Sequence, residues 1–226
     1  MPRKRVRTQT KKKKERKPPA PPVRVTIWAS SHGKEWHGMP DCLRKWFIEQ
    51  GRTNFHPLTF HAKGGGIICS SVVHKVRKAL RRSSGAAQCH VLILGSNNLR
   101  NEWKPWEISA QFKQILEFSD GIPLAHVVVC GILPSPETES DADTTKAYRD
   151  TTRLLKDLTT RYSRCSFLDI PDFFTDNRVV KENLYSVVRW GERRGLADIH
   201  FSHEGAQLYA KVLGGHIAFL KRETWM

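Results

Sequence analysis

Four short polar stretches of the sequence carry the residue types that acyl transfer requires. Ser31 stands on a turn after the β-branched stretch Val23–Ile27, and three consecutive glycines, Gly64–Gly66, follow a second candidate strand. Asn97 follows a third strand, and His200 lies shortly before the last candidate helix. A hydroxyl nucleophile, amide donors for an oxyanion and an imidazole base are the groups that ester hydrolysis needs.

Each stretch also has an ordinary structural interpretation. Ser31 could only shape a loop, and Asn97 could stabilise its own turn through a side-chain to backbone bond. His200 could be a core histidine beside Phe201, and Gly64–Gly66 could be a flexible connector. The four stretches in order, three at predicted strand ends and one before the last helix, favour a site over four separate structural roles.

Strands and helices alternate along the chain. The expected strands are Val23–Ile27, Phe55–Phe60, His90–Leu94, His126–Cys130 and Ser166–Ile170. The expected helices are Pro40–Gln50, Ser70–Arg82, one after Trp103 that ends at Asp120, Tyr148–Tyr162, and one from Glu204 with Ser202 as its cap. We expect an exposed loop at Glu137–Asp143 and an irregular, partly helical course at Asp172–Leu196.

This alternation predicts a three-layer α/β/α sandwich with a mostly parallel, flavodoxin-like five-stranded sheet. In that strand order the carboxyl ends of the first three strands lie side by side, and ligands bind at that edge. Ser31, the glycine turn and Asn97 are therefore expected to meet there. A chain end that folds back against the first strand would add His200, since catalytic groups are defined by geometry and not by sequence order.

The first 22 residues differ from the rest in composition: they hold ten Lys and Arg residues, a single acid and the proline-rich end Pro18–Pro22. We expect residues 1–22 to be a disordered basic arm and residues 23–222 to form one folded domain. The side chains that we expect to bind nucleic acid or an import receptor include Arg3, Lys4, Arg5, Lys11, Lys12, Lys13 and Lys14. The alternative is a solubilising arm without a specific partner.

The five cysteines, Cys42, Cys69, Cys89, Cys130 and Cys165, are scattered and form no C-x-x-C pair. We expect reduced, mostly buried thiols, as in a cytoplasmic or nuclear protein. The pattern indicates neither a metal nor a cofactor. No apolar run is long enough for a membrane span, and none follows the basic start as in a secretory signal.

Four blocks, in this order, resemble the SGNH (GDSL-type) hydrolase family over Val23 to about Leu220. Ala29-Ser30-Ser31-His32 stands where the family has Gly-Asp-Ser, and Lys63-Gly64-Gly65 resembles its glycine block. Gly95-Ser96-Asn97-Asn98 resembles Gly-x-Asn-Asp, and the stretch from Asp198 to Gly205 resembles the last block. The chain is similar in particular to esterase-like domains of animal retroelements, whose first block can also read Ser-Ser-His.

The resemblance implies a serine esterase that acts through an acyl-enzyme on a small ester. Ser31 would be the nucleophile, and Gly64 or Gly65 would form the oxyanion hole with Asn97 and the Ser31 amide. His200 would be the general base, because the family places a glycine five residues after its histidine, and that spacing selects His200 over His203.

The family pattern breaks at three carboxylates. The family has an aspartate three residues before its histidine, where this chain has Ala197, and Asp198 is only two residues before His200. Asp198 could still reach the imidazole after a shift of the loop, or His200 could use a backbone carbonyl instead. Ser30 and Asn98 also stand where the family has acids.

A competing hypothesis is a catalytically degenerate module on the same fold that binds nucleic acid or protein. Its surface would be the basic arm together with the helix Ser70–Arg82, although a basic outer face is more often simply solvated. A nucleophile elbow of the α/β-hydrolase type is disfavoured, because Ser31 follows the first strand. A phosphate loop is disfavoured as well, since no Gly-Lys-Ser/Thr follows the glycines.

Overall fold

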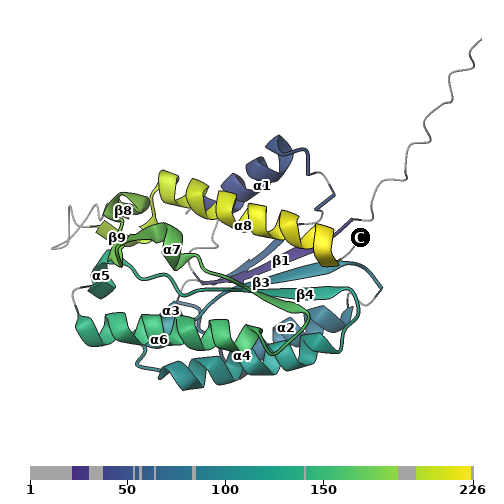
Figure 1. Ribbon diagram of the computed structural model, residues 1–226, viewed down its shortest axis with the longest axis horizontal. Coiled ribbons are helices and arrows are strands. Elements are labelled where there is room, and N and C mark those ends of the chain that lie inside the picture. The colour runs from purple at the N-terminus through teal and green to yellow at the C-terminus, as the bar shows by residue number, and fades with distance from the viewer. Residues whose placement is uncertain are drawn as a thin grey trace, which may run out of the picture.

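The computed structural model describes residues 22–30, 38–52, 54–55, 58–63, 65–82, 85–139, 141–187 and 197–224, with the side chains of 197, 198 and 221–224 left out. A central sheet lies between two layers of helices (Figure 1). The basic arm falls outside the described residues, so its expected disorder and its contacts stay predictions.

The sheet contains five of the strands that the structure describes, all parallel, in the order β2-β1-β3-β4-β5. These strands are β1 (Arg24–Ala29), β2 (Leu58–Ala62), β3 (Gln88–Ile93), β4 (Ala125–Cys130) and β5 (Cys165–Leu168). This is the predicted flavodoxin-like order. It confirms the three-layer α/β/α class.

Helices cover both faces of the sheet (Figure 1). One face carries α1 (Met39–Glu49) and α8 (His203–Thr224), and the other carries α2 (Ser70–Arg82), α4 (Pro105–Asp120) and α6 (Ala142–Thr159). The carboxyl edge of the sheet is followed by the short helices α3 (Ser96–Arg100), α5 (Pro136–Glu139) and α7 (Pro171–Phe174). Two small antiparallel pairs lie beyond them, β6 (Thr175–Asp176) with β7 (Val179–Val180) and β8 (Tyr185–Val187) with β9 (Ala197–Phe201).

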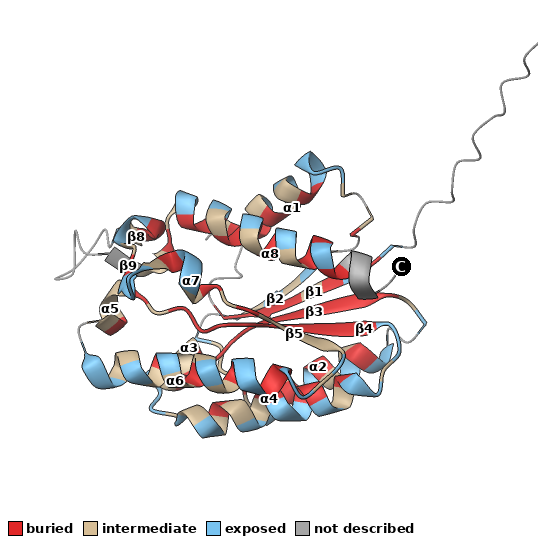
Figure 2. Cartoon of the chain, viewed as in Figure 1, coloured by how far each residue is buried: buried red, intermediate tan, exposed pale blue. Residues whose placement is uncertain are grey.

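The central strands are buried on both sides because both faces are covered, and most of their residues are apolar. All six residues of β3 and of β4 are buried (Figure 2). Alternate residues face opposite layers: Val25 and Ile27 belong to the core under α1 and α8, whereas Trp28 and Leu92 belong to the core under α2, α4 and α6. The long apolar runs in the sequence therefore predicted these strands correctly.

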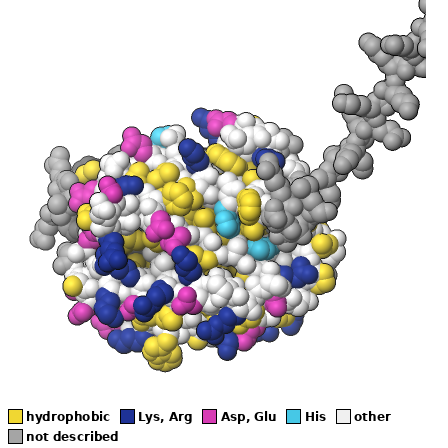
Figure 3. Space-filling view, in the orientation of Figure 1, with side chains coloured by type: hydrophobic (Ala, Val, Ile, Leu, Met, Phe, Trp, Pro, Cys, Tyr) yellow, Lys and Arg dark blue, Asp and Glu magenta, His cyan; other side chains and the backbone are white. Residues whose placement is uncertain are grey.

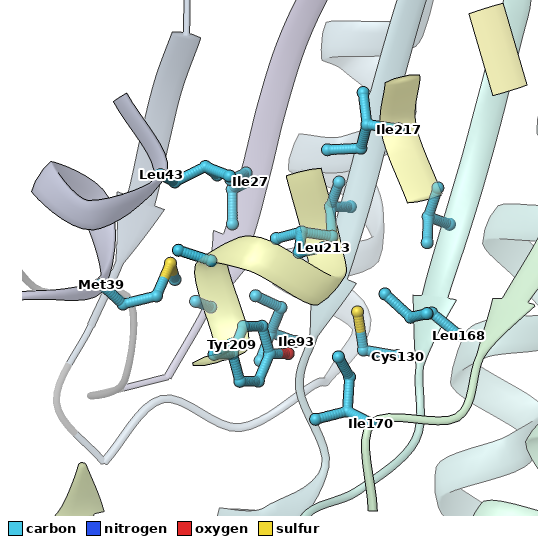
Figure 4. Packing of buried hydrophobic residues seen from close by; sticks show 14 of the residues in the cluster. Ile27, Met39, Leu43, Ile93, Cys130, Leu168, Ile170, Tyr209, Leu213 and Ile217 are labelled. Carbon is cyan, nitrogen blue, oxygen red and sulfur yellow. The ribbon is translucent and has the colours of Figure 1, made fainter. Parts of the chain in front are cut away.

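Helix α8 closes the first core against the sheet (Figure 4). Tyr209, Leu213 and Ile217 point from this helix toward the strands and are fully buried. Gly214 faces α1, where a Cβ would lie 2.4 Å from the ring of Trp46. Glycine at this position lets α1 and α8 pack closely side by side.

α6 spans Ala142–Thr159, so it begins six residues before the predicted start at Tyr148. Two further elements differ from their sequence predictions. The second strand begins at Leu58 and not at Phe55, whose ring stacks on Phe47 at 5.0 Å between centroids. The expected loop at Glu137–Asp143 begins in the short helix α5, where Thr138 is buried and its Oγ1 donates to the carbonyl of Ser135 at 2.7 Å. Local packing, which residue spacing does not reveal, determines both.

The five cysteines are free, as predicted for reduced thiols. The prediction that they are mostly buried is wrong: Cys89 and Cys130 are buried on the central strands, and the other three are partly exposed. Burial raises the pKa of the Cys130 thiol to about 12, so it packs as a neutral apolar group. Among the described residues, no helix is long and apolar enough to cross a membrane.

A chain of buried polar side chains crosses the second core. Trp28 Nε1 donates to His90 Nδ1 at 3.2 Å, and His90 Nε2 lies 2.9 Å from Gln88 Oε1. Gln88 Nε2 in turn donates to the carbonyl of Leu80 at 3.1 Å. Since the indole can only donate, Nδ1 must be unprotonated and Nε2 must carry the hydrogen. The chain is therefore complete only when His90 is neutral.

Acid should destabilise the protein through His90. Burial, together with the nearby His61, lowers the pKa of His90 to about 4. An unfolded histidine titrates near ~6.5, so stability present above that pH is lost as the pH falls toward 4, by up to roughly 3 kcal/mol. The His90→Gln side chain can still accept and donate hydrogen bonds but does not titrate. The variant should therefore bind one proton fewer than the parent when it unfolds in acid.

The measurement is urea unfolding between pH 4.5 and 8 for both proteins. Burial lowers the pKa of His126 to about 4 as well, so the variant should retain part of the pH dependence. Identical pH dependence in the parent and in His90→Gln would contradict the assignment.

Candidate functional site

The carboxyl ends of β1, β2 and β3 meet at one edge of the sheet. The ladder continues one residue beyond β1, where the Ser30 amide donates to the Ile93 carbonyl at 3.2 Å, and Lys63 N donates to the Ala29 carbonyl at 3.3 Å. Ser30 is buried, with 1% of its surface exposed. Ser31 is the next residue and lies outside the described part of the chain.

A tight turn follows β2. Gly65 has a φ of +66°, which favours glycine, and Gly66 N donates to the Lys63 carbonyl at 2.9 Å. A Cβ on Gly66 would lie 2.8 Å from that same carbonyl oxygen. The turn therefore requires glycine at both positions, whereas Gly64 lies outside the described residues.

Asn97 connects the end of β3 to the glycine turn. It is the second residue of α3, and its Nδ2 donates to the Gly66 carbonyl at 3.1 Å. Gly95 begins this segment with a φ of +114°, and a Cβ there would lie 2.6 Å from Ile132. The structure thus brings together two of the stretches that the sequence analysis selected, Gly65–Gly66 and Asn97.

Asn98, the next residue, joins α3 to the loop before α2 from inside the core. Its side chain is fully buried, Oδ1 accepts from Ile68 N at 2.8 Å, and Nδ2 donates to the Ile68 carbonyl at 2.9 Å. One amide therefore satisfies both backbone groups of a residue in the loop before α2. Sequence analysis treated Asn98 only as a replaced acid and missed this role.

The last block is held by Leu184, in the 3₁₀ turn Glu182–Leu184 that precedes β8. The Leu184 carbonyl accepts from Ser202 N at 3.0 Å, and Ser202 Oγ accepts from Gly205 N at 3.1 Å. A Cβ on Gly205 would lie 2.0 Å from the Leu184 oxygen, so no larger residue fits. Ser202 caps α8 as predicted, and the glycine five residues after His200 is required by the close approach of backbone.

His200 lies in an irregular part of β9. Tyr185 pairs with Phe201 and Val187 pairs with Ala197, so β9 has two more residues than β8 between these pairs. Residues 198–200 form this bulge, and Ser186 Oγ donates to the His200 carbonyl at 3.2 Å. The His200 side chain is partly exposed. Bulges commonly re-aim side chains beside active sites.

The two remaining candidates in this block differ. Asp198 belongs to the bulge, but its side chain is outside the described set. His203 is the first residue of α8, exposed, with Nε2 at 2.9 Å from Gln207 Nε2. The choice of His200 over His203 stays a prediction.

Two small cavities, each of about 20 Å³, lie under the amino end of α3. One is lined by residues that include Ser30, Ser96 and Gly131, and the other by residues that include Ser96, Asn97 and Ile199. Ser30 precedes Ser31 and Ile199 precedes His200 in the sequence. The chain positions next to the predicted nucleophile and base therefore both border Ser96.

A larger cavity of about 330 Å³ lies beside the second of these and shares Pro134 and Tyr148 with it. Its floor includes Ile132 and Pro171, and its rim carries charged groups. Burial raises the pKa of Tyr148 to about 12, so this phenol stays neutral, and its Oη donates to the Ser96 carbonyl at 3.3 Å. Within the described residues, no cluster of His, Cys, Asp and Glu could hold a metal ion.

Comparison with solved structures identifies the architecture. A GDSL-like lipase of Bacteroides thetaiotaomicron has a TM-score of 0.64 at 12% identity, over 87% of this chain and 88% of the lipase. This chain has the fold of the GDSL-like hydrolases. An acetyl xylan esterase matches with a TM-score of 0.64 at 15% identity, over 86% of this chain and 99% of the esterase.

A lipase from a goat rumen metagenome matches with a TM-score of 0.60 at 15% identity, over 85% of this chain and 96% of the lipase. No protein-family model and no curated protein matches the sequence. At these identities the likeness establishes the fold of the GDSL-like hydrolases and not the activity.

Asn98→Ala should lower the free energy of unfolding by roughly 2 to 4 kcal/mol, because it leaves both backbone groups of Ile68 buried without a partner. Asn98→Asp should lose at least as much at pH 7, since an ionised carboxylate cannot donate to the Ile68 carbonyl. In this variant, burial and the nearby Ile68 carbonyl should raise the pKa of the introduced carboxyl. Its loss in free energy of unfolding, relative to the parent, should therefore become smaller as the pH falls and the carboxyl protonates.

Urea unfolding at pH 7 and pH 5 measures both effects. The Ala variant serves as the control, since it has no titrating group at position 98. An Asp variant as stable as the parent at pH 7 would show that the hydrogen bonds from Asn98 to the Ile68 backbone do not stabilise the protein.

Proposed function

We propose that the chain is a serine ester hydrolase of the SGNH type. The observation that carries the proposal is the bond from the Asn97 amide to the Gly66 carbonyl. It joins two predicted oxyanion-hole segments at the edge of the sheet where β1 ends at Ala29, just before Ser30. The similar folds of GDSL-like lipases and an acetyl xylan esterase support it. Ser31 is the proposed nucleophile and His200 the proposed base.

In the proposed reaction, His200 removes the Ser31 proton as Oγ attacks the ester carbonyl, and the alcohol leaves with that proton. Water then attacks the acyl-enzyme and gives a proton to His200. The bond between the acyl carbon and Ser31 Oγ breaks, the carboxylic acid leaves, and His200 returns the proton to Ser31 Oγ. The Asn97 amide nitrogen carries two hydrogens, and the bond to Gly66 uses one of them. The second hydrogen, with amides from the glycine turn and Ser31, is proposed to stabilise the oxyanion.

Asp198 is the proposed partner of the imidazole. The family spacing places its carboxylate at position 197, which is alanine here. The bulge at residues 198–200 supports Asp198 in that role, because two extra residues relative to β8 change how this segment presents its side chains. An aspartate so placed would orient His200 and stabilise its charged form.

The cavity of about 330 Å³ supports a small ester as the substrate, since it adjoins the Asn97 cavity and is of ligand size. Its apolar floor at Ile132 and Pro171 suits an acyl or alcohol group of a few carbons. The similarity to retroelement esterase-like domains, a cytoplasmic or nuclear location and the partners of the basic arm stay predictions of the sequence.

Reaction with a fluorescent fluorophosphonate, alongside turnover of p-nitrophenyl acetate, tests the nucleophile and the base. The parent should be labelled, Ser31→Ala should lose labelling, and His200→Ala should lose turnover by at least about 10³-fold. A folded parent that is neither labelled nor active would refute the proposal.

The chain offers a matched control in Ser166. Its Oγ lies 3.0 Å from His126 Nε2 and 2.9 Å from His216 Nε2, so it is a second serine beside imidazoles. It is the second residue of β5, at the opposite end of that strand from the proposed site. Ser166→Ala should keep full labelling. Labelling that persists in Ser31→Ala and disappears in Ser166→Ala would show that Ser166, and not Ser31, is the reactive serine.

Asp198→Asn tests the third member of the proposed triad. We expect kcat to fall by roughly 10²-fold to 10⁴-fold with little change in KM, because the carboxylate acts on the imidazole and not on the bound ester. Asp157→Asn, which changes an exposed carboxylate on α6 that lines neither the larger cavity nor the Asn97 cavity, is the control and should retain kcat. An unchanged kcat in Asp198→Asn would mean that His200 works as a dyad with Ser31.

A further inference from the structure

Helix α2 carries a surface of one charge sign. Its sequence, SSVVHKVRKALRR, contains five Lys and Arg residues, one histidine and no acid. His74, Lys75, Lys78, Arg81 and Arg82 are exposed, and Arg77 is partly exposed. We call these six residues the α2 surface.

The cations of the α2 surface differ from those on the other long helices. Lys146 and Arg153 on α6 pair with Asp150, and Lys156 pairs with Asp169, at 2.7 to 3.2 Å. Within the described part of the chain, no Lys or Arg of α2 forms an ion pair, and the neighbouring α4 uses Glu117 to pair with its own Lys113. Figure 3 shows basic and acidic side chains interspersed on the face in view. The α2 surface has an uncompensated positive charge.

Two of the arginines are held in place. The guanidinium carbons of Arg77 and Arg81, one turn apart on α2, lie 4.6 and 4.8 Å from the ring centroid of Phe118 on α4. A groove of about 350 Å³ is lined by His74, Arg77, Lys78 and Arg81 alone. Stacking on an aromatic ring reduces the conformational entropy that these side chains would lose on binding an anion.

The apolar side of α2 is already occupied. Val73, Val76 and Leu80 are buried in the core, and the exposed large apolar residues of the described chain all lie on other elements. The helix therefore has no apolar face to insert among lipids, as interfacial helices do. Its cations recur every three or four residues, about 5 Å apart along the axis, which suits a run of phosphates.

We propose that the α2 surface binds the phosphate backbone of nucleic acid without reading its bases. The occupant follows from charge complementarity: a polyanion with closely spaced phosphates matches an uncompensated row of cations that includes pre-positioned arginines. The ten Lys and Arg residues in the first 22 positions would strengthen the same association. This function is separate from ester hydrolysis.

The test compares two triple variants of the full chain. Lys75→Gln/Lys78→Gln/Arg82→Gln removes three exposed cations of α2 that do not stack on Phe118. Lys146→Gln/Arg153→Gln/Lys156→Gln removes the same formal charge from α6, where each cation is paired. Binding to RNA duplexes and single strands of two unrelated sequences is measured from about 50 to 300 mM salt, a range over which backbone contacts weaken steeply.

The α2 variant should bind about 10-fold to 100-fold more weakly near 100 mM salt, with the slope of log K against log salt reduced by about 2 to 3, equally for both sequences. The α6 variant should bind as the parent does. Equal losses in both variants, or none in the α2 variant, would overturn the proposal. Binding to phosphatidylserine vesicles that depends on α2, with no binding to RNA, would also overturn it.

Discussion

The structure depends on the parallel pairing of β1 with β2 on one side and with β3 on the other. Parallel strands end at the same edge, so three loops that are far apart in sequence begin within about 10 Å of one another, two strand spacings. The amide of Ser30 and the carbonyl of Ala29 extend these ladders beyond the strands themselves. This pairing brings together the loops that are joined by the bond from Asn97 to Gly66 and by the two bonds from the Asn98 side chain to the Ile68 backbone.

The buried elements of this fold were predictable from the sequence because burial leaves a periodic pattern. β3 and β4 are buried throughout and mostly apolar. α2 alternates apolar and basic residues at helical spacing, so its bounds were predicted correctly. β2 is an edge strand whose residues are only partly buried or exposed, and its pattern is weak for that reason. Phe55 was assigned to β2 because the sequence pattern does not distinguish an aromatic residue just before a strand from one within the strand.

The site was predictable to the extent that it depends on strand ends. The glycine turn and Asn97 were expected to lie together because they follow the two parallel strands that flank β1, and the bond from Asn97 to Gly66 confirms this. Residue spacing could not show that the last block lies in a bulged strand, since the bulge exists only relative to β8 and its pairing at Tyr185 and Val187. The role of Asn98 was hidden for the same reason, because its partner Ile68 is 30 residues away.

The carboxylates that the chain lacks do not all bear on catalysis. At position 98, Ile68 requires a side chain that both accepts and donates, which an amide does and an ionised carboxylate does not. At position 30 the chain has a small buried serine whose backbone continues the sheet, and an acid there would be buried beside apolar neighbours such as Ile93. Of the three changes, only Ala197 lies where the proposed proton transfer would need a carboxylate. The proposed hydrolysis therefore depends on whether the β9 bulge brings Asp198 to His200, and not on the number of acids that differ from the family pattern.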